Sequence, residues 1–264
     1  LFRMVDAVMS CANKLCGIED IYVDNQATNF IDYLLQDDAV TDSFKVSVLI
    51  GVILVVFFTV IAILRAIAKD KVDETPGKIL MKGLKSILGF FFVWFIMIVV
   101  TGTINVFAKA IYEATMNGCS SLGSFMFVVC AQDAGLSEAE RITFLNEPTR
   151  YLSTSAVKDA IDLSDFNFIA SWLVAGVVLF TLVSTLGVFI ERAISLVLLL
   201  IAAPISISSS VLDDGSRFKL WRDQVLVKYV TSFGIIIGIN IYIMIIGIVT
   251  RKDVKFFEDS FLNN

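Results

Sequence analysis

This chain of 264 residues contains no histidine, so its chemistry must come from carboxylates, cysteines, lysines and arginines. Without histidine there is no Ser-His-Asp or Cys-His catalytic set and no histidine metal site. That excludes histidine-based membrane proteases of the rhomboid and zinc types. The sequence also contains no glycine-rich phosphate loop and no dinucleotide fingerprint. No pair of carboxylates or cysteines has a spacing that suggests a site. We therefore expect a protein that is not an enzyme and binds no cofactor or metal.

The most distinctive polar stretch follows a proline and combines acidic, glycine, basic and aromatic residues. Its members are Pro204, Asp213, Asp214, Gly215, Arg217, Phe218, Lys219, Trp221, Arg222 and Asp223. Either aspartate at its start can cap a helix, which places Phe218 and Trp221 on one face. Arg217, Arg222 and Asp223 then lie away from that face. The amphipathic indole of Trp221 suits a membrane–water interface. The stretch predicts an interfacial helix that contacts a partner or a substrate passage, or a simple surface anchor between two spans.

Four other polar residues lie within or between apolar stretches. Glu191 and Arg192 stand where two apolar runs meet. Ionisable groups at membrane depth usually pair or line a polar cavity. The alternative for this pair is a tight helical turn at the lipid headgroups. Asn105 and Asn240 fall inside apolar runs, where they would form hydrogen bonds between helices or line a pathway.

The elements that must position these residues are five long stretches without a charged residue. Each has 19 to 25 residues: 46–64, 87–108, 166–190, 193–212 and 229–250. A helix needs about 20 apolar residues to cross the hydrocarbon core of a bilayer. Strands of a membrane barrel would instead alternate over about 10 residues. We therefore expect an all-α polytopic membrane protein with five hydrophobic helices, four or five of them crossing. Gly234 and Gly238 form a G-x-x-x-G pattern that permits close helix packing.

Charge predicts which connections face the cytoplasm. The connection 65–86 carries six basic and three acidic residues, so it should be cytoplasmic. Residues 1–43 and 109–165 then lie outside. Their charge agrees, because the first region has two basic and eight acidic residues and the second has four and eight.

This topology divides the chain into five parts. Residues 1–43 form amphipathic helices that lie on lipid, on neighbouring subunits or on the chain's own outer loop. The remaining parts are a first transmembrane hairpin at 44–108, an outer cap at 109–165, a second membrane bundle at 166–250 and a tail at 251–264. In the cap, Ser137 and Glu140 predict a capping box that starts a short helix ending before Pro148.

The charge pattern does not decide on which side of the membrane the interfacial helix, residues 213–228, lies. If 193–212 crosses completely, this helix lies outside and the C-terminus inside. If 193–212 is a re-entrant hairpin, the helix lies in the cytoplasm. The second arrangement is favoured by Arg217, Lys219, Arg222 and Lys228, and the first by Arg251 and Lys252.

All four cysteines fall in the two regions predicted to lie outside: Cys11, Cys16, Cys119 and Cys130. This placement suits disulfides in an oxidising compartment, and three pairings are possible. The alternative is four free thiols that serve as small apolar side chains.

The stretch from Pro204 to Asp223, followed by an apolar helix, resembles the TrbL-like family of type IV secretion systems. These are polytopic membrane subunits, and the resemblance is to those of Gram-positive conjugative elements. It covers about residues 190–250 and extends to 44–108 only as two spans joined by a basic loop. It implies a non-enzymatic scaffold of a mating channel in the bacterial cytoplasmic membrane. Several copies would assemble with secretion ATPases and other membrane subunits, and relaxase-linked DNA would pass through the assembly.

Two other functions fit the sequence. An independent small-solute or ion transporter is suggested by Glu191 and Arg192 beside the helix interrupted at Pro204. A membrane protein that binds an external ligand is suggested by the length of the cap. The net charge of −5 and the lack of a basic stripe argue against a chain that grips DNA by itself.

Overall fold

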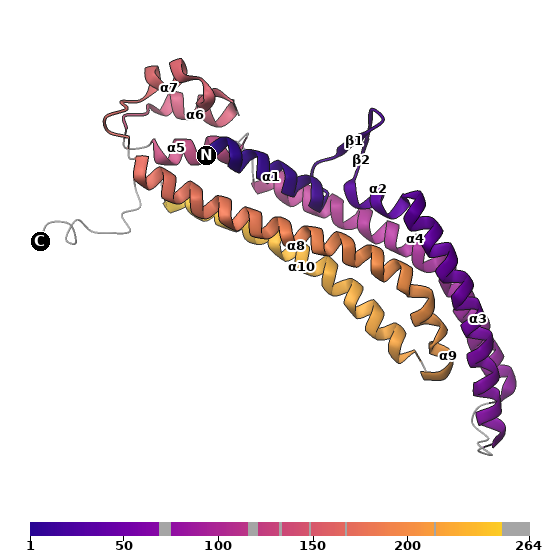
Figure 1. The fold of residues 1–264 in the computed structure, drawn as a ribbon. Coiled ribbons are helices and arrows are strands. Elements are labelled where there is room, and N and C mark those ends of the chain that lie inside the picture. Colours follow the sequence, from indigo (N-terminus) through magenta and orange to yellow (C-terminus); the bar gives the residue numbers. More distant parts are fainter. Residues whose placement is uncertain are drawn as a thin grey trace, which may run out of the picture. The chain divides into compact units, whose positions relative to one another are not determined.

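The computed structural model describes residues 1–68, 75–115, 121–131, 134–147, 149–166, 168–213 and 215–249. These residues are almost entirely α-helical, which confirms the predicted all-α class (Figure 1). In chain order the elements are α1 (Phe2–Cys16), β1 (Ile21–Val23), β2 (Gln26–Thr28), α2 (Phe30–Gln36), α3 (Asp38–Ala68), α4 (Pro76–Thr115), α5 (Leu122–Cys130), α6 (Glu138–Asn146), the 3₁₀ turn η1 (Arg150–Leu152), α7 (Thr154–Ala160), α8 (Phe168–Ser208), α9 (Ser210–Asp213) and α10 (Ser216–Val249).

Three helices of the described residues are long and apolar enough to cross a membrane, not the five predicted. They are Asp38–Ala68, Pro76–Ala114 and Ser171–Ser208. The number is wrong partly because α8 runs without a break through Glu191 and Arg192 and so joins two predicted runs. The fifth run, 229–250, lies in α10 but ends outside the described residues. At 1.5 Å per residue, the 41 residues of α8 extend about 60 Å, roughly twice the hydrocarbon thickness.

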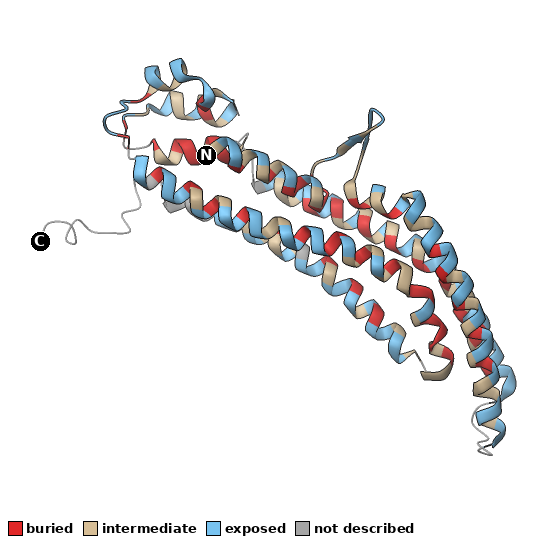
Figure 2. Ribbon diagram, in the orientation of Figure 1, coloured by how far each residue is buried: buried red, intermediate tan, exposed pale blue. Residues whose placement is uncertain are grey.

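Most of the apolar surface of these helices is uncovered. Only 22 % of the most apolar stretch of α3 and 28 % of that of α8 are buried within the protein. Figure 2 shows exposed residues along the length of the long helices. On α4, Phe91 and Phe95 are both exposed. Such continuous apolar exposure is far beyond the patches of a soluble monomer and is consistent with a membrane protein.

The described chain forms two compact units. The cap unit contains Leu1–Lys14, Ala108–Val188 and the described residues from Gly234. The motif unit contains Leu15–Phe107 and Phe189–Phe233, and it includes the distinctive stretch that follows Pro204.

The cap unit has two apolar clusters joined by one carboxylate. Val5 and Met9 of α1 are buried with residues of α5 and α8, so α1 packs on the chain's own cap. Asp6 accepts hydrogen bonds from the Gly123 backbone N–H and the Tyr151 hydroxyl, both at 2.6 Å. Burial and this bond raise the pKa of Tyr151, which keeps the hydroxyl a donor. The predicted capping box also forms, and Ser137 and Glu140 start α6.

The motif unit is built around one apolar cluster shared by α2, α3, α4, α8 and α10. Ile31 and Leu35 of the short amphipathic α2 are almost fully buried in it. Thus α2 packs on the chain itself. Asn29 fixes its start by accepting from the Ile31 N–H, while its amide donates to the Gly17 carbonyl. The hairpin β1–β2, which the sequence analysis missed, turns at Asp24 and Asn25, both with positive φ.

Replacing Asp6 by alanine should loosen the cap. The change removes the acceptor of two charge-assisted hydrogen bonds and should destabilise α5 by about 2 kcal/mol. Hydrogen exchange of α5 amides in detergent should then speed up by about 30-fold. The matched control is Asp159→Ala, since Asp159 is exposed on α7. Equal exchange in the two variants would contradict the role of Asp6.

Candidate functional site

The site begins with the proline inside α8. Pro204 has no N–H to donate to the Leu200 carbonyl four residues earlier, although α8 stays helical through this position. The carbonyls on either side of Leu200 accept hydrogen bonds from side chains of neighbouring helices. Trp221 of α10 donates its indole N–H to the Leu199 carbonyl at 2.7 Å. Ser47 of α3 donates its hydroxyl to the Ile201 carbonyl. Side-chain donors from α3 and α10 therefore hold the turn that precedes Pro204.

A glycine on α3 lets this turn approach closely. A Cβ atom at Gly51 would lie 2.9 Å from the Pro204 Cβ, so a side chain there would force the helices apart. Ser208 strengthens the contact by donating to the Gly51 carbonyl at 2.9 Å. By contrast, the predicted packing residues Gly234 and Gly238 have no described atom within 4 Å of a built Cβ. The sequence shows Gly51 only as one more glycine in an apolar run.

The stretch after Pro204 folds as a tight turn and the start of α10. Gly215 has φ +84°, in the left-handed region that favours glycine. The Asp213 carboxylate accepts from the Gly215 N–H at 3.2 Å and from the Arg217 N–H at 3.4 Å. Its ion pair with the Arg217 guanidinium, at 3.6 Å, adds to this cap. Asp213, the last residue of α9, thus stabilises the start of α10. Asp214 lies outside the described residues.

The first turns of α10 present the two predicted faces. Phe218 and Trp221 stack with ring centroids 5.5 Å apart and an angle of 15° between their planes. Trp221 is buried in the core of the motif unit. On the other face, Lys219 and Arg222 are exposed, and Arg222 pairs with Asp223 at 2.9 Å. The aromatic face thus holds α10 against α8, and the two helices form a helical hairpin. The charged face is available for contacts.

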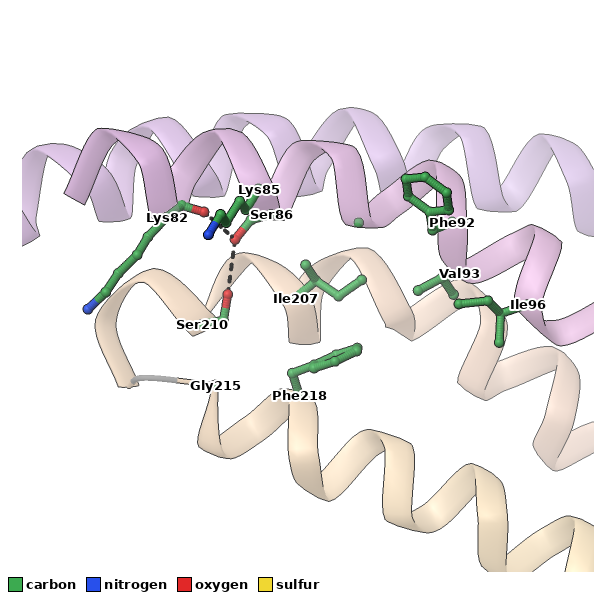
Figure 3. A pocket seen from close by; sticks show the side chains of 11 residues that line it. Lys82, Lys85, Ser86, Phe92, Val93, Ile96, Ile207, Ser210, Gly215 and Phe218 are labelled. Atoms are coloured by element: carbon green, nitrogen blue, oxygen red, sulfur yellow. Dashed lines mark hydrogen bonds between the residues drawn. The ribbon is translucent and has the colours of Figure 1, made fainter. Parts of the chain in front are cut away.

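A cavity of about 390 Å³ lies between α4 and the turn from α9 to α10. Figure 3 shows Lys82, Lys85 and Ser86 at one end, with Ser210 and Gly215 facing them. The Ser86 and Ser210 hydroxyls form a hydrogen bond of 3.0 Å that joins α4 to α9. The opposite end is apolar, and its wall consists of Phe92, Val93, Ile96, Ile207 and Phe218.

The Glu191–Arg192 pair does not form the predicted turn. Both residues continue α8, and because successive helical residues point about 100° apart, their side chains diverge. Glu191 is exposed and pairs with Lys228 of α10. Arg192 is only 2 % exposed, and its guanidinium nitrogens have no hydrogen-bond partner among the described residues. Its Cζ lies 5.5 Å from the centroid of the Tyr229 ring, a cation–π contact.

Asn105 of α4 is a second buried polar side chain. The amide oxygen and nitrogen of Asn105 have no hydrogen-bond partner among the described residues. Gly17 permits this arrangement, since a Cβ there would lie 2.5 Å from the Asn105 amide oxygen. Asn240 belongs to α10, and its side chain lies outside the described part of the chain. Asn105 is therefore a buried polar group, but not the expected interhelical hydrogen bond.

The three described cysteines are not joined to one another by a disulfide. Cys11 is exposed, Cys16 is buried and Cys130 is half-buried. Burial raises the pKa of the Cys16 thiol to about 11, so this residue serves as a small apolar side chain. Cys119 lies outside the described residues. The disulfides of the sequence analysis stay a prediction.

Comparison with known proteins adds no relative. No protein-family model, no curated protein and no solved structure matches this chain. The resemblance to the TrbL-like family therefore rests on the residues from Pro204 to Asp223 themselves.

Removing the indole donor should weaken the hairpin. Trp221→Phe keeps the aromatic contact with Phe218 but leaves the Leu199 carbonyl without this bond, which should destabilise the protein by about 1–2 kcal/mol. The measurement is thermal unfolding in detergent. Trp172→Phe is the matched control, because Trp172 is 66 % exposed on α8. If the two variants unfold at the same temperature, the bond to Leu199 does not stabilise the hairpin.

Proposed function

We propose that this chain is a membrane-embedded structural and channel subunit of a type IV secretion machine. It helps form the path for conjugative DNA transfer across the bacterial cytoplasmic membrane. The observation that carries the proposal is the bond between Trp221 and the Leu199 carbonyl, in the turn that precedes Pro204. The resemblance singles out both Pro204 and Trp221, and this bond gives them one shared structural role.

The geometry of the motif unit supports a cytoplasmic position for residues 213–228. Lys82 and Lys85 of α4 line the same cavity as Gly215 and Phe218 of the α9–α10 turn. The basic end of α4 and the basic start of α10 therefore lie at one end of the unit. Basic residues beside membrane spans favour the cytoplasm, so both belong there in this proposal. The N-terminal region and the cap then face outward.

The exposed charged face of α10 is suited to bind the cytoplasmic parts of the machine. Arg217, Lys219 and Arg222 are exposed at its start, and none of them is needed for the aromatic packing of Phe218 and Trp221. In the proposal this face contacts a secretion ATPase. The uncovered apolar surfaces of α3, α4 and α8 contact lipid and further copies or other membrane subunits, and the DNA–relaxase substrate meets the chain only within that assembly.

Deletion of this protein should abolish conjugative transfer, and the intact gene supplied in trans should restore it. A triple variant, Arg217→Ala, Lys219→Ala and Arg222→Ala, should accumulate normally in the membrane but lower transfer at least tenfold, because it removes the partner-binding charges. The control replaces Lys14, Lys109 and Lys158 by alanine, because these three exposed lysines carry the same total charge and lie outside the motif unit. Affinity purification of the intact protein should recover a secretion ATPase. Normal transfer from a deletion strain would refute the function.

A second candidate, an independent solute or ion transporter, is favoured by Arg192. A buried guanidinium without a hydrogen-bond partner among the described residues costs several kcal/mol, and such groups in membrane helices commonly line substrate paths. This candidate predicts saturable flux in liposomes that contain the purified protein alone. Flux should disappear with Arg192→Met while thermal stability is kept or raised. Liposomes without flux would exclude this candidate and leave the secretion role untouched.

A further inference from the structure

We propose that the cavity between α4 and the α9–α10 turn binds an anionic phospholipid. The phosphate headgroup lies at the lysine end, and an acyl chain follows the apolar wall. This inference rests on the membrane placement proposed above and is independent of the secretion role.

The polar end of the cavity has the chemistry of a phosphate site. Lys82 and Lys85 line this end together with Ser86 and Ser210, and Figure 3 shows the Lys85 ammonium group near the two hydroxyls and the Lys82 side chain extended away from them. Gly215 also lines this end, directly before the first residue of the 34-residue helix α10. The Asp213 carboxylate already accepts the Gly215 and Arg217 N–H groups at this helix start. The positive charge that attracts a phosphate to this end therefore comes from the two lysines.

The apolar end distinguishes a lipid from a free anion. Val93 and Ile207 form its buried floor. Phe92 is 62 % exposed and Ile96 is 53 % exposed, so the wall continues onto the lipid-facing surface of α4. A small hydrated phosphate would leave this wall unused. A phospholipid fills both ends, because its charged group and its chain are joined in one molecule.

The position of the cavity in the membrane agrees with this ligand. The lysine end lies at the basic end of the motif unit, which the proposed topology places at the cytoplasmic leaflet. Anionic lipids there attract basic side chains with about 1 kcal/mol per lysine. The cavity volume of about 390 Å³ falls within the range of small-molecule sites, roughly 300–1,000 Å³. It accommodates a headgroup and the start of one chain.

The bound lipid would also strengthen the contact between α4 and α9. The Ser86–Ser210 hydrogen bond connects α4 to α9 at the cavity. A phosphate between Lys82, Lys85 and the start of α10 adds a second connection at the same place. We therefore expect the lipid to stabilise the hairpin of α8 and α10 against α4.

Native mass spectrometry of the purified full chain tests this proposal. Phosphatidylglycerol should bind, whereas phosphatidylcholine at the same concentration should bind at least tenfold more weakly. The double variant Lys82→Gln and Lys85→Gln should weaken phosphatidylglycerol binding by about 30-fold, from roughly fivefold per lysine. The charge-matched control, Lys45→Gln with Lys158→Gln, should bind like the unmodified protein, because neither lysine lines the cavity.

Two further measurements keep the outcome decisive if a variant folds poorly. Lys82→Arg with Lys85→Arg keeps the charge and should retain binding, and thermal unfolding without lipid checks the fold of every variant. Glycerol phosphate, which has the anion without the chain, should not compete with phosphatidylglycerol at equal concentration. Equal binding of phosphatidylcholine, unchanged binding by the double glutamine variant, or full competition by glycerol phosphate would each overturn the proposal.

Discussion

Pairing of backbone polar groups away from water is the constraint on which the motif unit depends. Lipid offers no partner to a carbonyl, so a proline inside a membrane helix is best tolerated where neighbouring helices supply donors around it. In α8 the Trp221 indole and the Ser47 hydroxyl donate to the Leu199 and Ile201 carbonyls, on either side of the Leu200 carbonyl that Pro204 deprives of its helical donor. Gly51 permits the approach that makes both bonds possible.

The hydrogen bonds that Trp221 and Ser47 donate to α8 also determine where the charged residues at the start of α10 lie. The Trp221 bond draws the start of α10 back along α8, and Asp213 and Gly215 close the turn between them. The turn then lies beside the lysines of α4, where it completes the cavity. The proposed cytoplasmic face, lipid site and ATPase contact all follow from this one arrangement, whereas Arg192 is buried apart from them against Tyr229.

Local chemistry made part of the structure predictable. The capping box at Ser137 and the aromatic face of α10 follow from side chains a few residues apart, and both are present. The turn predicted at Glu191 and Arg192 is wrong, because charged residues interrupt an apolar run without interrupting the backbone hydrogen bonds of a helix. Glu191 points outward and pairs with Lys228, so α8 continues through this position. The partner of Gly51 lies about 150 residues away, and no local pattern reveals it. The cavity likewise joins residues of α4 and α10 that only the fold brings together.

Cysteine labelling of two sites tests the central claim most directly. Gly77 of α4 and Ser216 of α10 are exposed, and both belong to the end of the motif unit that we place in the cytoplasm. Gly77→Cys and Ser216→Cys would be introduced separately into a chain that lacks its native cysteines, with a membrane-impermeant thiol reagent as the probe. We predict that both sites are protected in intact cells and labelled in inside-out vesicles. Labelling of Ser216→Cys in intact cells, with Gly77→Cys protected, would place the two sites on opposite sides of the membrane and contradict the account.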